Sequence, residues 1–165
     1  MGHRREVLQT GWVGKRRLVD QGMGSESFSM SESATSIIIF AHGSKVAEAN
    51  ETIARLAREV SRNSGCPALA AYLEVAQPDL SAAVADSIRA GARRVVIVPC
   101  FLVFGVHVRE DLPRLVENLE STHPGVEFLV SQPLEGHPGL GEILASRVRE
   151  TLAAEAIGSA GRREG

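Results

Sequence analysis

Two histidines and one glutamate follow short apolar runs of the chain and could together hold a metal ion. They are His42, Glu74 and His107. Imidazole nitrogens and a carboxylate suit a borderline divalent ion such as Fe²⁺, Co²⁺ or Ni²⁺. The spacing alone is weak evidence, because these side chains meet only if the fold brings them to one edge.

Each candidate also has a structural interpretation. His42 could be a histidine satisfied by a neighbouring carbonyl, and Glu74 a solvated carboxylate at the end of a strand. A phosphohistidine enzyme is disfavoured, since its pattern has Arg where this chain has Ala41. Cys100 is more typical of a buried thiol than of a ligand. His137 lies between Gly and Pro, which favours a turn entering a helix over ligand contact.

The order of apolar patterns predicts the elements that position these residues. Continuous apolar runs typical of buried strands cover residues 37–40, 68–73, 95–98 and 126–130. Apolar residues at helical spacing follow each run, within 46–60, 80–88, 108–119 and 140–152. Four strand-helix units predict an α/β fold with a four-stranded parallel sheet and helices on both faces. Ligands of such sheets bind at the carboxyl ends of the strands.

Composition indicates one globular domain between two tails. The chain has 165 residues, 44% of them hydrophobic and 23% charged, with a net charge of -2. We expect a flexible N-terminal tail over 1–35, a folded domain over 36–156 and a disordered C-terminal tail over 157–165.

Charge, cysteine content and hydropathy exclude several partners and compartments. Residues 34–156 carry eleven Lys and Arg against fifteen Asp and Glu, a balance that disfavours nucleic-acid binding. Cys66 and Cys100 form neither a disulfide framework nor a paired metal motif. No apolar run reaches the roughly 18 residues that would span a bilayer. A reduced, cytoplasmic protein without a membrane partner is the expectation.

Four segments, taken in order, resemble the small sirohydrochlorin chelatases. These segments are AlaHisGlySer at 41–44, TyrLeuGlu with GlnProAspLeu at 72–80, ProCysPheLeuValPheGlyValHisValArgGluAspLeuPro at 99–113 and ProLeuGluGlyHisProGlyLeu at 133–140. The third is the most specific, because Pro-x-Phe-Leu-x-x-Gly-x-His-x-x-x-Asp-x-Pro is a long pattern. The resemblance covers about residues 36–155. It implies a single-lobe, three-layer α/β/α fold of the chelatase type.

The resemblance also implies an activity and a partner. Such enzymes insert Co²⁺ or Fe²⁺, and less often Ni²⁺, into sirohydrochlorin or a related tetrapyrrole without ATP or another nucleotide, in cobalamin or sirohaem biosynthesis. It implies a homodimer whose two lobes enclose one cleft. His42 and His107 correspond to the metal-handling pair, and Glu74 to the acidic residue near them. One of these three groups is expected to accept protons from the macrocycle.

The remaining predicted contacts would hold the tetrapyrrole. The apolar segment with Phe101, Leu102 and Phe104 is expected to pack on the macrocycle face. Basic side chains would hold its carboxylates, or else be solvated surface charges; they are Lys45, Arg109 and Arg114. Ser44 and Gly105 are also predicted to contact the bound molecule.

Two other functions remain possible on the residues alone. A metal or tetrapyrrole carrier would need the same ligands, so the sequence does not separate it from an enzyme. A flavodoxin-like module for a phosphorylated small molecule is less favoured, because the loop after the first strand lacks a Gly-rich phosphate cradle.

Overall fold

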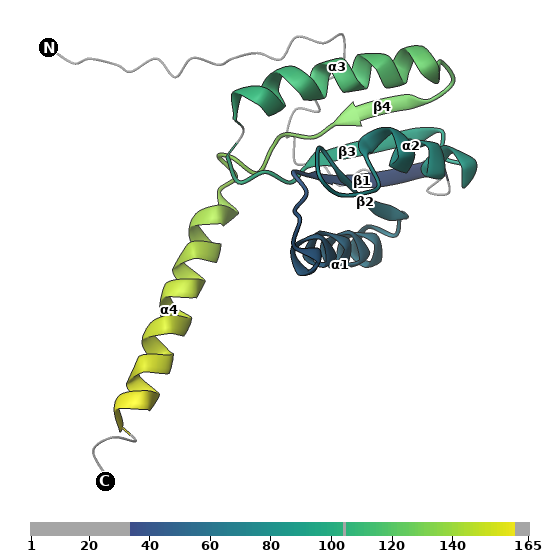
Figure 1. The fold of residues 1–165 in the computed structure, drawn as a ribbon. Helices are drawn as coiled ribbons and strands as arrows, with labels where there is room; N and C mark the ends of the chain where they lie inside the picture. Colours follow the sequence, from purple (N-terminus) through teal and green to yellow (C-terminus); the bar gives the residue numbers. More distant parts are fainter. Residues whose placement is uncertain (1–33, 104, 161–165) are drawn as a thin grey trace, which may run out of the picture. The chain divides into compact units, whose positions relative to one another are not determined.

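The computed structural model describes residues 34–103 and 105–160 (Figure 1). Nearly all of the predicted tail 1–35 lies outside the described residues, as do Phe104 and residues 161–165. The side chains of Val106, His107 and residues 156–160 also lie outside them. The fold is therefore described for nearly all of the predicted domain.

Four parallel strands form one sheet in the order β2-β1-β3-β4. Their bounds are β1 Thr35–Ala41, β2 Ala68–Tyr72, β3 Arg94–Pro99 and β4 Glu127–Val130. In the register, Ile37 of β1 lies between Ala68 of β2 and Val96 of β3. The predicted all-parallel sheet is confirmed. The strand order reverses at β1 and β3, so the carboxyl ends of these two strands are the expected ligand position.

Helices connect and follow the strands as the apolar spacing predicts. Their bounds are α1 Ala47–Ser64, α2 Leu80–Arg89, α3 Val106–Thr122 and α4 Gly139–Ala160. Local chemistry fixes several ends. Asp79 caps α2 by accepting a hydrogen bond from the Ala82 amide at 2.8 Å. Gly65 ends α1 in the left-handed conformation, with φ 73°.

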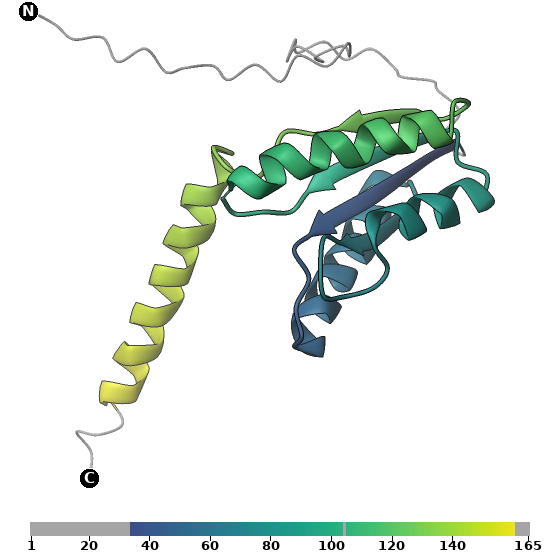
Figure 2. The same cartoon turned by 45° about the horizontal axis from the view of Figure 1, so that its top comes forward.

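The sheet separates two apolar cores. Alternate residues of β1 divide between them, because neighbouring side chains of a strand point to opposite faces. Ile38 and Phe40 pack with α2 and α3, whereas Ile37 and Ile39 pack with Ala57 of α1. Figures 1 and 2 both show α3 running beside β4. Helices thus cover both faces, as expected for a three-layer α/β/α fold.

The last helix differs from the sequence expectation in two ways. It continues to Ala160, so residues 157–160 are helical although the composition predicts a disordered tail from 157. Alanines at 153, 154 and 156 favour this continuation through their high helix propensity. Its apolar residues Leu144, Val148 and Leu152 are also exposed, at 62%, 58% and 63%. Among the described residues, no helix is long and apolar enough to cross a membrane.

Candidate functional site

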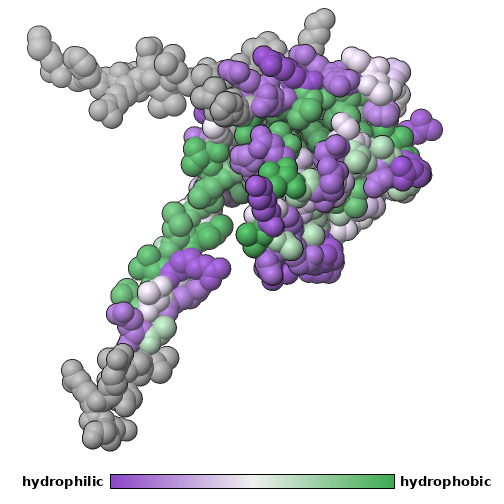
Figure 3. All heavy atoms as spheres, viewed as in Figure 1, coloured by the Kyte–Doolittle hydropathy of each residue, from purple (hydrophilic) through white to green (hydrophobic). Residues whose placement is uncertain are grey.

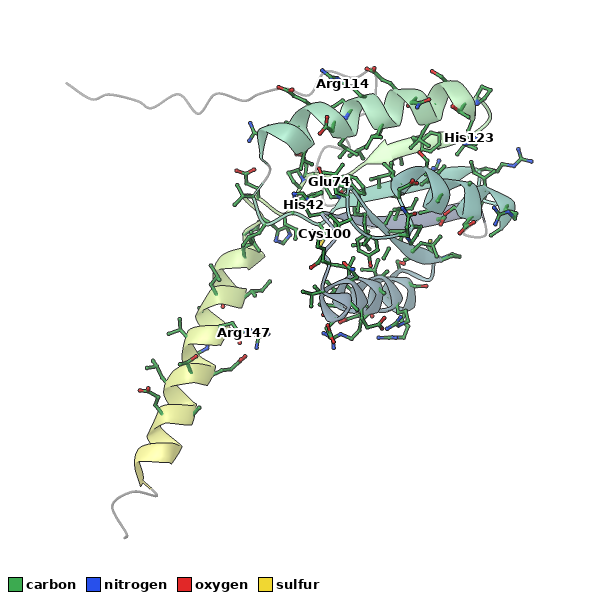
Figure 4. The ribbon with its side chains drawn as sticks, viewed as in Figure 1. His42, Glu74, Cys100, Arg114, His123 and Arg147 are labelled. Atoms are coloured by element: carbon green, nitrogen blue, oxygen red, sulfur yellow. The ribbon has the colours of Figure 1, made fainter. Side chains whose placement is uncertain are left out.

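Hydrogen bonds continue the parallel ladder past the ends of the strands and bring His42 and Glu74 together. The Leu73 amide donates to the Ala41 carbonyl at 2.9 Å, and the Glu74 amide donates to the His42 carbonyl at 3.0 Å. On the other side of β1, the Cys100 amide donates to the Phe40 carbonyl at 2.7 Å. His42 and Glu74 are exposed at this rim, and Figure 4 shows them near Cys100.

Gly43 allows the two loops at this rim to touch. Its φ is 89°, a conformation that costs a non-glycine residue energy. A Cβ atom at this position would overlap the Glu74 carbonyl oxygen and lie 3.2 Å from Tyr72 Cβ. The glycine that follows His42 is therefore required by the close approach of Glu74.

The backbone on the far side of Glu74 is held as well. Val75 has φ 64°, which is rare for a β-branched residue and costs about 1–3 kcal/mol. The Ala76 amide donates to the Glu74 carbonyl at 2.6 Å. The Tyr72 amide donates to the Pro78 carbonyl at 2.9 Å and closes the loop. The Glu74 carbonyl thus has little room to move away from Gly43.

Asn50, on the first turn of α1, holds the loop that carries His42. Its side-chain oxygen accepts from the Ser44 amide at 2.9 Å, and its side-chain nitrogen donates to the Ser44 carbonyl at 2.7 Å. The Tyr72 hydroxyl donates to the Asn50 carbonyl at 2.9 Å. Sequence reasoning missed Asn50, and a polar residue in the first turn of a helix was the one signal available. Ser44 is predicted to contact a ligand, and its backbone amide and carbonyl both form hydrogen bonds with the Asn50 side chain.

The apolar segment after β3 divides between core and surface. Phe101 is 7% exposed and packs edge-on against Phe40 and His42, with ring centroids 5.8 and 6.1 Å apart. This burial does not support the predicted direct contact of Phe101 with a macrocycle; its ring instead supports the imidazole of His42. Leu102 and Val103 are 63% and 69% exposed and form the open apolar surface of this segment.

His107 is the second residue of α3, and its side chain lies outside the described residues. Gly105 is the N-cap of α3, and its amide donates to the Val103 carbonyl at 3.1 Å. Across the described side chains, no three His, Cys, Asp or Glu residues are grouped so that they could hold a metal ion. The predicted pairing of His42 with His107 remains a prediction.

The three basic residues predicted to contact the ligand, Lys45, Arg109 and Arg114, lie in different parts of the fold. Lys45 is exposed in the loop between His42 and α1. The Arg109 guanidinium lies 3.6 Å from the Glu135 carboxylate, in the loop before α4. Arg114 lies on α3, well apart from His42 and Glu74 in Figure 4. Of the three, Lys45 is the one that shares a loop with His42.

Contacts within the fold account for Cys100 and His137, so neither residue needs a ligand to explain its position. Burial raises the pKa of the Cys100 thiol, which disfavours the thiolate that would bind a metal. The Cys100 side chain packs in the core under α1. His137 Nδ1 accepts from the Gly139 amide at 3.0 Å and so supports the start of α4. This contact matches the helix-entry interpretation of His137.

We expect Asn50→Ala to lower the turnover of any reaction at His42 about ten-fold with a smaller change in KM. The variant removes both hydrogen bonds to Ser44, and a displaced imidazole reacts poorly even where ligands still bind. Asn50→Asp keeps the oxygen that accepts from the Ser44 amide but loses the nitrogen that donates to the Ser44 carbonyl. Its turnover should lie between those of the wild type and Asn50→Ala. Asn118→Ala, on the exposed surface of α3, is the matched control. Equal turnover of both alanine variants would contradict this positioning role.

The fold and the rim together define a class of protein. It is a doubly wound α/β protein with an exposed histidine at the switch point of the sheet, where such folds bind ligands. Comparison with known families agrees, since the model of the CbiX family matches residues 36–151. The chain belongs to the CbiX family.

The chain is similar in sequence to sirohydrochlorin chelatases and in structure to a CbiX protein. The chain is 30% identical over 137 residues to the chloroplastic sirohydrochlorin ferrochelatase of Arabidopsis thaliana, covering 82% of this chain and 57% of that protein. It is 29% identical over 121 residues to a sirohydrochlorin cobaltochelatase of Saccharolobus islandicus, covering 70% and 94%. The crystal structure of a CbiX protein from Marinobacter aquaeolei superposes with a TM-score of 0.66 at 34% identity, covering 74% and 98%. The chain thus spans little more than half of the plant relative and nearly all of the other two proteins.

Proposed function

We propose that this protein inserts a divalent metal ion into sirohydrochlorin or a related tetrapyrrole. The observation that carries the proposal is an exposed imidazole, His42, at the switch point of a CbiX-family domain and hydrogen-bonded through its backbone to Glu74. The relatives named above are chelatases for iron and for cobalt. Co²⁺ and Fe²⁺ are therefore the proposed substrates, with Ni²⁺ the less favoured.

The chemistry needs groups that this rim provides. Insertion exchanges two pyrrole N–H protons for one M²⁺ ion, so two protons leave as the metal enters. A neutral imidazole at His42 binds the ion as it loses water and releases it more readily than a set of thiolates would. Glu74 is the proposed proton acceptor, since an exposed carboxylate beside the metal passes protons on to water. His107 is the proposed second nitrogen ligand.

Substrate binding is proposed at the surface next to His42. Leu102 and Val103 offer an open apolar surface for a flat macrocycle, and Lys45 offers a charge for its carboxylates. One lobe presents this surface openly, so a homodimer that places two lobes around one macrocycle is part of the proposal.

The direct test is anaerobic incubation of the full chain with sirohydrochlorin and, separately, Co²⁺, Fe²⁺ and Ni²⁺. Absorbance of the macrocycle reports insertion against a control without protein. We expect acceleration with at least one of Co²⁺ and Fe²⁺. A protein that binds metal or tetrapyrrole tightly without accelerating insertion would be a carrier, and the enzyme proposal would then fail.

A further inference from the structure

The loop between β2 and α2 contains a tight turn with an unfavourable residue at its centre. The Ala76 amide donates to the Glu74 carbonyl at 2.6 Å, and Val75 between them has φ 64°. A hydrogen bond over two residues with a positive φ at the middle residue defines a rare and strained form of γ-turn. In the described part of the chain, no other non-glycine residue has a positive φ.

Packing within the chain does not compensate for this strain. Glycine could form the same turn without the steric cost. The Val75 side chain is 62% exposed, so its isopropyl group buries little surface against its own chain. Stiffness does not explain the residue either, because a β-branched side chain disfavours positive φ. A contact with a molecule outside the chain remains as the reason for an isopropyl group here.

The strain distinguishes Val75 from other apolar residues at the surface. Figure 3 shows hydrophobic side chains among hydrophilic ones on the face in view. Such exposure is ordinary in a folded protein and by itself indicates no function. Residues held in a strained backbone conformation, by contrast, cluster at ligand sites, where the strain has a use.

Val75 lies on one side of His42, and exposed apolar residues lie on the other side. The Glu74 amide donates to the His42 carbonyl, so Val75 comes one residue after a contact with the His42 loop. Strand β1 lies between β2 and β3, and the segment after β3 carries Leu102 and Val103 at 63% and 69% exposure. The ends of β2 and β3 are two strand spacings apart, about 10 Å. Apolar side chains therefore flank the polar groups of the rim.

This order of groups matches the chemistry of a flat tetrapyrrole. The pyrrole nitrogens that take the metal lie at the centre of the ring, and the outer carbon atoms are apolar apart from the carboxylate side chains. A macrocycle whose centre meets His42 must extend past it on both sides. It then reaches Val75 as well as the segment after β3.

We propose that Val75 is a specificity-determining residue that contacts the tetrapyrrole on the β2 side of His42. The strained turn keeps the isopropyl group at the rim, where a bound macrocycle would cover it. The inference rests on the proposed function and adds a contact to it. In Val75→Gly, we expect weaker binding of the macrocycle without a loss of fold stability.

The first measurement is binding of metal-free sirohydrochlorin to the full chain by anaerobic equilibrium dialysis, with absorbance reporting the bound macrocycle. Val75→Gly should raise Kd about ten-fold, because three apolar carbon atoms leave the contact. Val75→Ile keeps an apolar, β-branched side chain and should stay within about two-fold of wild type. Leu56→Ala, on α1, is the control, since it removes an apolar side chain that is 38% exposed away from the rim. An unchanged Kd in Val75→Gly would overturn the proposal.

Denaturant unfolding distinguishes a ligand contact from a structural role. Val75→Gly relieves the positive-φ strain, and this relief exceeds the added flexibility of the unfolded chain. Its unfolding midpoint should therefore be at least as high as that of wild type. Weaker binding together with a lower midpoint would mean that Val75 shapes the loop instead of contacting the ligand, and the proposal would fail.

Binding and metal insertion give separate outcomes. If the variants bind as expected while no metal ion is inserted faster, the enzyme proposal fails and the Val75 contact stands. If insertion is accelerated while Val75→Gly binds as tightly as wild type, the contact fails and the enzyme proposal stands. A wild type that binds no sirohydrochlorin would refute the contact. Unchanged binding with an altered mass by light scattering would assign Val75 to a protein contact instead, and the proposal would also fail.

Discussion

Replacing His42 with alanine is expected to reduce metal insertion by about 10²–10⁴-fold, the range over which a positioned acid, base or ligand acts. The imidazole is an exposed nitrogen donor at the switch point, and its ring packs edge-on against Phe101, which the substitution does not change. The loss should appear in turnover more than in tetrapyrrole affinity, because the apolar surface at Leu102 and Val103 is unchanged. Initial rates above the uncatalysed reaction, measured at several tetrapyrrole concentrations, separate the two.

His123→Ala is the matched control for this experiment. His123 ends α3 beside the start of β4, far from His42 in Figure 4. Its removal should leave the rate unchanged. Added imidazole should restore part of the His42→Ala activity, since the site is open to solvent. A His42→Ala rate within two-fold of wild type would show that another group handles the metal.

Gly43→Ala is expected to destabilise the fold by about 2–5 kcal/mol. The left-handed backbone at φ 89° costs an alanine about 1–2 kcal/mol. The overlap of its Cβ with the Glu74 carbonyl oxygen adds about 1–3 kcal/mol, the typical cost of overpacking. The Glu74 carbonyl cannot easily move away from the added Cβ atom, because hydrogen bonds hold the loop before and after Glu74. Denaturant unfolding of the purified variant measures the loss.

Gly65→Ala isolates the conformational part of that cost. Gly65 has φ 73°, yet a Cβ atom there would meet nothing within 4 Å. Its loss should be limited to about 1–2 kcal/mol. The difference between the two variants is then the steric cost of the contact between the rim loops. Equal losses in both would mean that the Glu74 loop yields, and the two loops would not be rigidly coupled.

The sequence by itself determined the order of elements and the edge at which the chemistry lies. Continuous β-branched runs such as Ile37–Phe40 specify buried parallel strands, since both faces of the strand must be apolar. Strand-helix alternation then requires a parallel sheet, which places His42 and Glu74 at one rim. These features depend on local pattern and on general rules of chain connection, and both can be recognised in a single sequence.

Only the tertiary structure decided which residues support the rim and which surfaces remain open. Asn50 reaches the Ser44 backbone across a helix start, and Phe101 turns inward beneath His42 although its segment predicts an open apolar wall. The periodicity of α4 shows an apolar side without showing what covers it, because a helix buried in its own chain and one buried in a partner have the same pattern. Contacts between distant residues depend on packing and on the direction of connecting loops. Sequence spacing does not encode these, so the hydrogen bonds of Asn50 and the exposed apolar surface at Leu102 and Val103 could be identified only from the fold.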